Sequence, residues 1–397
     1  MNKIAIIGTG YVGLVTGLGF AKLGHSIHFV DIDKEKIRKL KNQELPFFEP
    51  GLAEILTDTE VSNRVTYSSS YTDELKQVDI VFVCVQTPEV DGGGSNTSFL
   101  LDALASLFEF TEDNTIICIK STTPPAFIQE LEKADIDTHS IIFNPEFLRE
   151  GSALEDFFNP DRIVIGGSGK TSMEILYRLY SEFNSEIITT DSTTALLIKY
   201  LSNTYLPMRL SFVNEAFQLG NSLNADIPTL LNGIGADKRI GKDYFRPSPG
   251  WGGSCFPKDT KALEATIKET NLNAPLINSI NKSNEEHISW FADRIISLSS
   301  ENSMEKIVLY GSAFKENTDD LRASPSIELY KIIQSKKCEV YIFDEFGHDI
   351  ENSISDEESI TSSFVVIMYP VKDIETLITS LNLKENKIYI PWENKVI

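Results

Sequence analysis

Short runs of apolar and β-branched residues alternate with helix-length segments through the first 170 residues of the chain. In runs such as Ile80–Val83 every residue is apolar, which is typical of strands covered on both faces. The alternation predicts a doubly wound, parallel α/β sheet. The expected strands are Lys3 to Gly8, Ser26 to Val30, Ile80 to Val85, Thr115 to Lys120, Ser140 to Phe143, and Arg162 to Ile165.

The pattern becomes helical between Asp191 and about Lys282, with apolar positions at three- and four-residue spacing from Ala195 to Leu219. Strand–helix alternation then resumes. The further strands are expected at Lys306 to Tyr310, Glu339 to Phe343, Phe364 to Met368, and Lys387 to Ile390. We therefore expect an α/β protein in which two Rossmann-like domains (1–190 and 291–397) are joined by a central helical domain (191–290).

The composition is that of an ordinary globular protein, with 41% hydrophobic and 24% charged residues. The net charge of −22 disfavours nucleic acid and anionic membrane surfaces as partners, although helix N-termini could still hold an anionic small molecule. Because no apolar run approaches the roughly 18 residues of a membrane span, and glycines interrupt the first apolar stretch, we expect a cytoplasmic protein. The four cysteines and five histidines lack disulfide-framework or metal-site spacing, so no metal is expected.

A glycine motif, Gly8-Thr9-Gly10-Tyr11-Val12-Gly13, follows the first expected strand and opens a helix. In a dinucleotide-binding fold, Gly8 would make the tight turn, Gly10 would let the backbone approach a pyrophosphate, and Gly13 would let the helix pack closely on the strand. The phosphates would lie at the helix N-terminus. Because strand, motif, helix and second strand follow in order, the sequence predicts a dinucleotide site.

An acidic residue, Asp31, ends the second strand 18 residues after Gly13. Its carboxylate could accept hydrogen bonds from the ribose hydroxyls and would repel a 2′-phosphate, which indicates NAD rather than NADP. Asp33 is the alternative, but strand alternation leaves only one of the two facing the ribose, and Asp31 is preferred.

The glycine-rich stretch from Pro249 to Asp259 contains the strongest candidate nucleophile. Pro257 suits the first turn of a helix, so Cys255 falls at or just before a helix N-terminus, where the dipole favours thiolate. A nearby Lys258 would further favour the thiolate, and Asp259 could face the same pocket. A small buried cysteine at a turn is the alternative.

Two further polar groups are less specific. Lys199 and Asn203 share one face of the long helix, but such spacing is common, and taken alone it favours a solvated lysine. Glu146 and Glu150 follow a strand at the carboxyl edge of the sheet, where open α/β sheets bind ligands. They could be acid–base or positioning groups, or merely an acidic loop at a helix start.

Five segments together resemble the UDP-glucose/GDP-mannose dehydrogenase family over essentially the whole chain. The glycine–cysteine loop and 144–151 are the specific ones, whereas GxGxxG is widely shared. The segments are Gly8 to Leu14, Lys120 to Pro125, Asn144 to Gly151, Ile234 to Pro257, and Gly311 to Pro325.

The resemblance implies a four-electron oxidation of a nucleotide-sugar alcohol to a carboxylate with two NAD+, in a homodimer built through the central helices. It makes Cys255 the nucleophile, with Lys199, Asn203, Asp259, Glu146 and Thr122 around the reacting carbon and the water. Residues expected at the cofactor are Gly8, Gly10, Tyr11, Val12, Gly13, Asp31, Lys36, Thr87, Thr122 and Glu150. Those expected at the sugar nucleotide are Glu146, Phe147, Leu148, Glu150, Lys199, Asn203, Arg239, Tyr244, Phe245, Gly252, Lys315 and Arg322, with Arg239 reaching the partner subunit's substrate.

Several positions depart from the family pattern. Ala323 stands where many members have Glu, Thr123 where Val is usual, and Ala126-Phe127 where Gly-Thr is usual. Two segments, Arg239 to Gly241 and Ser254 to Lys258, resemble the UDP-glucose branch more than the N-acetylhexosamine branch, whose loop usually has His before the Cys. UDP-glucose is therefore the expected substrate, and UDP-N-acetylmannosamine or GDP-mannose is the alternative.

Two other classes of protein fit less well. A two-electron β-hydroxyacid dehydrogenase also has a Rossmann domain and a Lys-xxx-Asn pair, but it needs neither Cys255 nor a third domain. A non-enzymatic NAD sensor would not need Lys199, Cys255 and Asp259 together.

Overall fold

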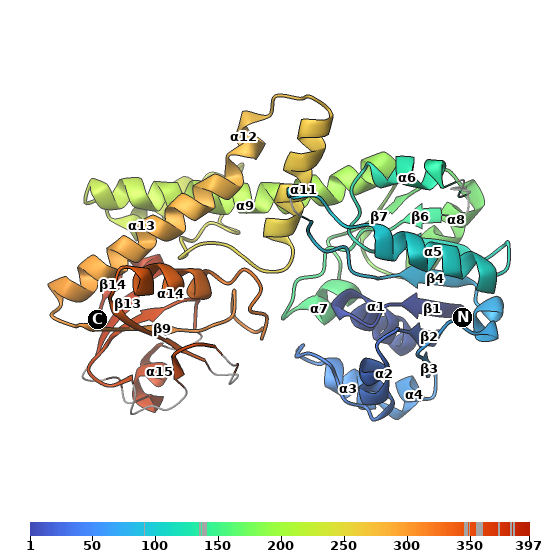
Figure 1. Cartoon of the computed structure of the whole chain (residues 1–397), viewed down its shortest axis with the longest axis horizontal. Helices are drawn as coiled ribbons and strands as arrows, with labels where there is room; N and C mark the ends of the chain where they lie inside the picture. The colour runs from blue at the N-terminus through green and yellow to red at the C-terminus, as the bar shows by residue number, and fades with distance from the viewer. Residues whose placement is uncertain are drawn as a thin grey trace. The chain divides into compact units, whose positions relative to one another are not determined.

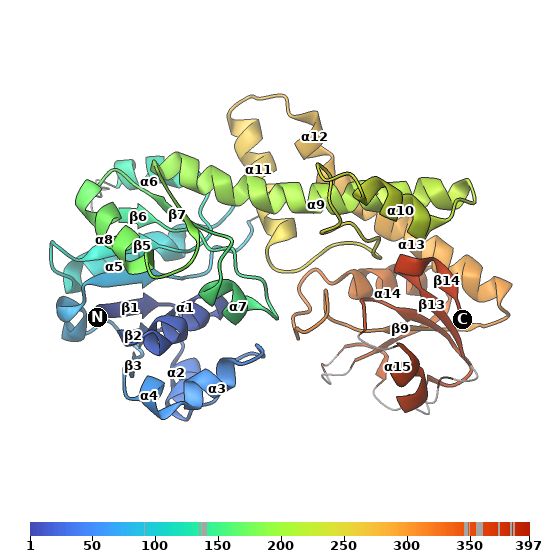
Figure 2. The ribbon, with the colours of Figure 1, turned by 180° about the vertical axis from the view of Figure 1, so that it is seen from behind.

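The computed structural model describes residues 1–90, 92–134, 136, 141–344, 348, 350–354, 360–371, 374–381, 383 and 386–397. The chain divides into two compact units (Figures 1 and 2). The first comprises residues 1–202 and 265–271, and the second comprises residues 203–264 and 272–397.

The first unit is built on an eight-stranded sheet with strand order β3-β2-β1-β4-β5-β6-β7-β8. The order reverses beside β1, which places the glycine motif at the topological switch point where open α/β sheets bind ligands. The strands are β1 (Lys3–Ile7), β2 (Ser26–Val30), β3 (Val65–Ser68), β4 (Ile80–Val83), β5 (Ile116–Ile119), β6 (Ile141–Phe143), β7 (Arg162–Gly166) and β8 (Glu186–Thr190).

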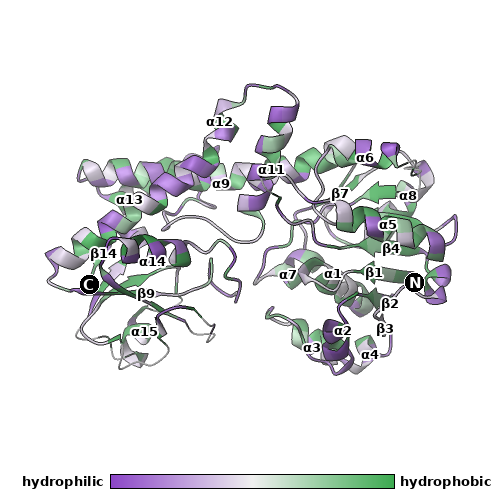
Figure 3. Cartoon of the chain, in the orientation of Figure 1, coloured by the Kyte–Doolittle hydropathy of each residue, from purple (hydrophilic) through white to green (hydrophobic). Residues whose placement is uncertain are grey.

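Both faces of this sheet are covered, as the continuous apolar runs predict. Ile4 and Ile6 pack in one core with residues of α1, whereas Ala5 and Ile7 lie in the opposite core with residues of α5 and α6. The helices of the unit are α1 (Tyr11–Lys22), α2 (Lys34–Lys41), α3 (Leu52–Thr57), α4 (Thr59–Ser62), α5 (Ser98–Phe110), α6 (Phe127–Lys133), α7 (Ala153–Phe158) and α8 (Lys170–Tyr180). In Figure 3 the central strands are coloured as hydrophobic, whereas α2 is coloured as strongly hydrophilic.

The second unit contains a six-stranded sheet with strand order β11-β10-β9-β12-β13-β14. Its strands are β9 (Lys306–Tyr310), β10 (Glu339–Phe343), β11 (Ser353–Ile354), β12 (Phe364–Ile367), β13 (Lys387–Ile390) and β14 (Lys395–Val396). Ile307 and Leu309 face a core shared with α13 and α14, and Val308 and Tyr310 face the core next to α15.

A 31-residue helix, α9 (Ser192–Ser222), confirms the long helix predicted from Ala195 to Leu219, and its residues begin in the first unit and end in the second. The remaining helices are α10 (Ile227–Gly235), α11 (Phe256–Glu269), α12 (Pro275–Asn278), α13 (Ile280–Glu301), α14 (Pro325–Ser335) and α15 (Ile374–Ser380).

The α/β class with two Rossmann-like sheets and a central helical region is confirmed, with two differences in detail. Strand β6 pairs antiparallel with β7, because the segment between them returns after α7 packs against α1. The sequence pattern missed β3, β8, β11 and β14, which are edge or short strands without a continuous apolar run. Ser140, the first residue of one predicted strand, lies outside the described residues, and the domain boundaries 1–190, 191–290 and 291–397 stay predictions.

Candidate active site

The glycine motif forms a tight turn between β1 and α1. Gly8 has a φ of +96°, which strains any other residue, and a Cβ on Gly13 would clash with the Gly8 carbonyl oxygen at 1.9 Å. A Cβ on Gly10 would meet nothing within 4 Å. The backbone at the start of α1 is therefore open to a ligand, which fits a pyrophosphate at this helix N-terminus. The side chains of Tyr11 and Val12 are partly buried against the core of this unit.

Asp31 binds the glycine turn directly. Its Oδ2 accepts hydrogen bonds of 2.7 Å from both the backbone N–H and the hydroxyl of Thr9. The rival carboxylate, Asp33, is the N-cap of α2 and accepts from the backbone N–H groups of Glu35 and Lys36. Of the two, Asp31 is the one that adjoins the turn, which favours it as the ribose ligand.

Threonines lie past the carboxyl ends of two neighbouring strands, β4 and β5. The hydroxyl of Thr87 donates a 2.7 Å hydrogen bond to the backbone carbonyl of Thr122. This bond ties together the two loops that the family resemblance places at the cofactor.

Lys199 is buried, so the sequence-based preference for a solvated lysine is wrong. The side chain is 4% exposed, and Nζ donates hydrogen bonds of 2.8 Å to Oε1 of Glu146 and 2.7 Å to the Glu146 carbonyl. The other carboxylate oxygen of Glu146 accepts from the N–H of Leu148. Lys199 and the 146–148 segment therefore form one buried polar cluster.

The charge of Glu146 is maintained by its neighbours. Burial opposes ionisation, but the charge and hydrogen bond of Lys199, the Leu148 N–H and the charge of Lys120 together hold the pKa of Glu146 below its ordinary value. Lys120 is itself buried, which lowers its pKa, and it donates to the side-chain oxygen of Asn144. Lys120 has no assigned role from the sequence.

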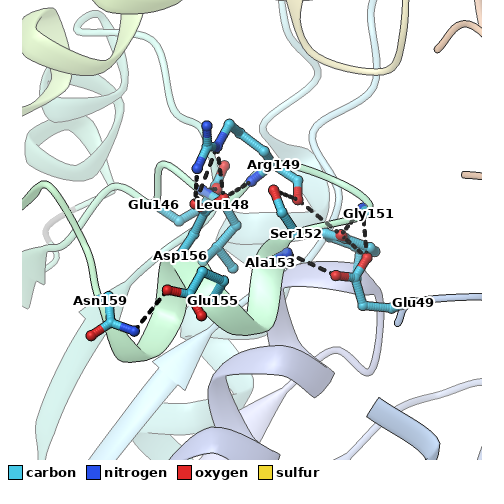
Figure 4. Close-up of polar contacts among 11 residues, drawn as sticks. Glu49, Glu146, Leu148, Arg149, Gly151, Ser152, Ala153, Glu155, Asp156 and Asn159 are labelled. Carbon is cyan, nitrogen blue, oxygen red and sulfur yellow. Dashed lines mark hydrogen bonds and ion pairs between the residues drawn. The ribbon is translucent and has the colours of Figure 1, made fainter. Parts of the chain in front are cut away.

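Phe147 and the loop around Arg149 adjoin the Lys199–Glu146 cluster in the first unit. The Phe147 ring lies 3.7 Å from the guanidinium carbon of Arg162 and 5.5 Å from Nζ of Lys199. Arg149 pairs with Asp156 on α7, and Gly151 binds the carboxylate of Glu49 (Figure 4). Glu150 lies between these two anchored residues and is partly exposed.

Cys255 occupies the N-cap position of α11, as the sequence predicts. Its carbonyl accepts a 2.8 Å hydrogen bond from the backbone N–H of Asp259, and Pro257 is the second residue of the helix. The thiol is partly exposed and lies 3.5 Å from the hydroxyl of Ser254. A thiol at this position can meet a ligand, and the helix dipole favours its ionised form.

Asp259 is fully buried one turn into α11. Its Oδ2 accepts a 2.7 Å hydrogen bond from the side-chain amide of Asn203, and Nζ of Lys258 lies 3.0 Å from Oδ1. In the second unit, the side chains of Asn203 and Lys258 therefore both contact the carboxylate of Asp259, close to the cysteine loop.

The glycines before Cys255 pack directly on the segment 314–323. A Cβ on Gly252 would lie 1.9 Å from the carbonyl oxygen of Ala323, and the N–H of Gly253 donates to the carbonyl of Arg322. Lys315, which lies over the Phe314 ring, and Arg322, which pairs with Asp320, belong to this segment. The close backbone approach explains why residue 252 must be glycine.

Two side chains on α13 hydrogen-bond to the backbone of residues 248–251, and no sequence pattern predicted them. Asn284 both accepts from the N–H of Trp251 and donates to its carbonyl, at 3.0 and 2.9 Å. Nε2 of His287 donates to the carbonyl of Ser248, and Nδ1 accepts from Gln218. Their three-residue spacing on one helix face is the only sequence signal for this pair.

The remaining predicted substrate residues differ in conformation and exposure. Tyr244 has a left-handed φ of +52°, whereas Phe245 is buried with its ring 5.2 Å from the guanidinium carbon of Arg209. Arg239 is 89% exposed and pairs with Asp237.

Within the described part of the chain, no group of three or more His, Cys, Asp or Glu residues could hold a metal ion. No described helix is long and apolar enough to cross a membrane.

A glycine turn at the switch point of a parallel sheet, followed by an acidic residue after the second strand, is typical of a dinucleotide-binding domain. Family models match residues 2–184 (NAD binding domain), 193–286 (central domain) and 308–384 (UDP binding domain). The chain therefore belongs to the UDP-glucose/GDP-mannose dehydrogenase family and is an NAD-dependent oxidoreductase.

Known relatives are similar over most of the chain. It is 40% identical over 359 residues to a UDP-glucose 6-dehydrogenase of Rickettsia bellii (strain RML369-C), covering 88% of this chain and 82% of the relative. A UDP-glucose dehydrogenase structure from Pyrobaculum islandicum is 28% identical with a TM-score of 0.87, covering 100% and 95% of the two chains. A UDP-N-acetyl-mannosamine dehydrogenase structure from S. aureus is 26% identical with a TM-score of 0.81, covering 98% and 94%.

Proposed function

We propose that this protein oxidises UDP-glucose at C6 to UDP-glucuronate, using two NAD+ and a covalent intermediate on Cys255. The observation that carries the proposal is the partly exposed Cys255 thiol at the N-cap of α11, joined through Asp259 to Asn203. The similarity to a relative named UDP-glucose 6-dehydrogenase supports the substrate.

The cofactor would be held by the α1 turn, with Asp31 at its ribose and Thr87 and Thr122 beside it. NAD+, when bound, accepts a hydride at each of the two oxidation steps. Tyr11, Val12, Lys36 and Glu150 are the other predicted cofactor contacts.

The chain's own residues account for the rest of the reaction. In the first oxidation a base or an ordered water takes the C6 hydroxyl proton, giving an aldehyde. The Cys255 thiolate then forms a bond to C6, and the resulting thiohemiacetal is oxidised to a thioester. The ammonium of Lys199 and the amide of Asn203 would stabilise the oxyanion.

Release of the product needs one water. Glu146 and Thr122 are proposed near that water and Asp259 is proposed to activate it, so that water attacks the thioester carbon and the C6–S bond breaks. The carboxylate leaves and Cys255 regains its thiolate. One alcohol, two NAD+ and one water thus become one carboxylate, two NADH and three protons.

The nucleotide sugar would be held by the segment 314–323 and the loop before Cys255, with Lys315, Arg322, Phe245 and Gly252 as contacts. Tyr244, Phe147 and Leu148 are proposed to complete the sugar site. Ser254 before Cys255 favours UDP-glucose over an N-acetylhexosamine substrate.

We further propose a cytoplasmic homodimer. Exposed apolar residues on α9 support the dimer, because Tyr205, Phe212 and Leu219 follow one another at seven-residue spacing. The exposed guanidinium of Arg239 would reach the diphosphate bound by the partner subunit, since guanidinium matches phosphate geometry.

The deciding experiment mixes the purified protein with NAD+ and UDP-glucose, UDP-N-acetylmannosamine or GDP-mannose, and follows NADH absorbance. We expect two NADH per UDP-glucose consumed and far slower reduction with the other two. A preference for UDP-N-acetylmannosamine, the substrate named for the S. aureus relative, would contradict UDP-glucose as the substrate. The proposed chemistry would stay the same.

A further inference from the structure

Glu49 is a buried carboxylate to which the proposed reaction assigns no task. It lies in the loop between α2 and α3 and is 3% exposed. Its Oε2 accepts from the Tyr11 hydroxyl. Figure 4 shows its two backbone donors: the N–H of Gly151 donates to Oε2 and the N–H of Ala153 donates to Oε1, each at 2.7 Å.

These partners belong to the two segments expected around the cofactor. Tyr11 is the first residue of α1, directly after the glycine turn, whereas Gly151 and Ala153 lie at the junction of the 144–151 loop and α7. The ring of Phe47, from the same loop as Glu49, packs 5.2 Å from the Tyr11 ring. The 47–49 segment therefore contacts α1 with an aromatic ring and both segments with a carboxylate.

The hydrogen-bond network has a fixed direction. Burial raises the pKa of Tyr11 far above its ordinary value, and the hydrogen bond and charge of Glu49 raise it further. Tyr11 therefore remains protonated and donates to Glu49. Its oxygen also accepts from the N–H of Gly151, at 3.1 Å, which closes a ring of three groups.

A buried carboxylate holds its donors firmly, because each lost hydrogen bond leaves part of its charge without compensation. The Gly151 N–H belongs to the peptide unit that follows Glu150. Movement at Glu49 would therefore displace both segments expected around the cofactor: α1 through Tyr11, and the peptide unit after Glu150 through Gly151.

We propose that Glu49 is a positioning residue for NAD, acting through Tyr11 and Gly151 to hold the glycine turn and the Glu150 loop in their binding arrangement. This inference rests on the proposed function only in placing the cofactor at these two segments. It requires no particular sugar substrate.

The test is Glu49→Gln, measured by NADH fluorescence titration without sugar. A glutamine offers one acceptor oxygen, so its NH2 group must face at least one of the backbone N–H donors of Gly151 and Ala153. We expect NADH to bind about tenfold more weakly, while UDP binding, measured by calorimetry, changes by less than about twofold. Glu54→Gln is the matched control, because Glu54 lies exposed on the adjacent helix α3.

A role in stability alone would lower the melting temperature but leave the NADH dissociation constant of the folded protein unchanged, and that result would overturn the proposal. Tyr11→Phe provides a second, milder variant, because the ring keeps its contact with Phe47 and loses only the hydroxyl. We expect several-fold weaker NADH binding, and a double variant no weaker than Glu49→Gln alone. If Glu49→Gln does not fold, unchanged NADH affinity in Tyr11→Phe overturns the proposal instead. A wrong sugar assignment would show in the turnover assay and leave these NADH measurements as they are.

Discussion

Asn203 donates a hydrogen bond of 2.7 Å from its side-chain amide to the buried carboxylate of Asp259. Asp259 in turn donates its backbone N–H to the carbonyl of Cys255. The first turn of α11 is therefore tied to α9 directly behind the candidate nucleophile. This link means that the position of the thiol depends on a residue 52 positions earlier in the chain.

Replacing the thiol tests the covalent mechanism. In Cys255→Ala we expect overall turnover to fall by several orders of magnitude, because the second oxidation loses its nucleophile. Substrate binding should change little, since the thiol makes few contacts with a nucleotide. Mass spectrometry of quenched wild-type enzyme should find a sugar adduct on the peptide that contains Cys255.

Cys338→Ala serves as the control, because Cys338 packs against the core that contains Ile333 and Val340 and belongs to no proposed site. It should retain turnover. Acid production by Cys255→Ala at a near-wild-type rate would refute the thioester and favour direct oxidation of an aldehyde hydrate.

Cofactor choice tests Asp31. Its carboxylate would face the additional phosphate of NADP+, and like-charge contact should lower kcat/KM with NADP+ on the order of a hundredfold relative to NAD+. Asp31→Asn should narrow this ratio. Asp33→Asn should not, because asparagine also caps helices well. Equal efficiency with both cofactors in the wild type would contradict the assignment of Asp31.

Subunit mixing tests Arg239. An Arg239→Ala protein should be inactive or nearly so, and mixing it with Cys255→Ala under subunit exchange should restore part of the activity if Arg239 acts across the dimer. Sedimentation should give twice the 44.4 kDa of the chain. Phe212→Glu, which places a charge in the exposed apolar row of α9, should shift the protein toward the monomer. A fully active monomer would exclude both the dimer contact and the donation of Arg239.

The buried imidazole of His287 predicts a loss of stability in mild acid. Burial lowers its pKa from 6.5 to about 4, although the hydrogen bond to the Ser248 carbonyl opposes this shift. Since the unfolded chain takes up the proton first, the contribution of the neutral imidazole to the free energy of unfolding is complete above pH 6.5. It is lost as the pH falls toward 4. The decrease in the free energy of unfolding should reach about 3 kcal/mol.

Carboxylates titrate in part of the same range, so the measurement compares wild type with His287→Gln. Urea unfolding at pH 7 and pH 4.5 should show a larger decrease for the wild type. Parallel decreases in the two proteins would show that His287 does not supply this pH dependence.

Much of the architecture could be predicted because it rests on local patterns. Continuous apolar runs such as Ile80–Val83 can be satisfied only between two layers, and those strands occupy the centre of the first sheet. Edge strands such as β8 were missed because an edge needs no such run. The antiparallel pairing of β6 with β7 depends on where α7 packs, which no local pattern encodes.

The same division applies to the site. Sequence spacing alone identified Gly8 to Gly13, Asp31 and Cys255 as candidates, because a tight turn, a strand end and a helix N-terminus are all local features of the chain. Only the tertiary structure decided that Lys199 is buried against Glu146 rather than solvated, that Asp259 holds Asn203, and that Glu49 joins Tyr11 to Gly151. These contacts link residues 38 to 102 positions apart, and a buried charge is tolerated only where such distant donors meet it.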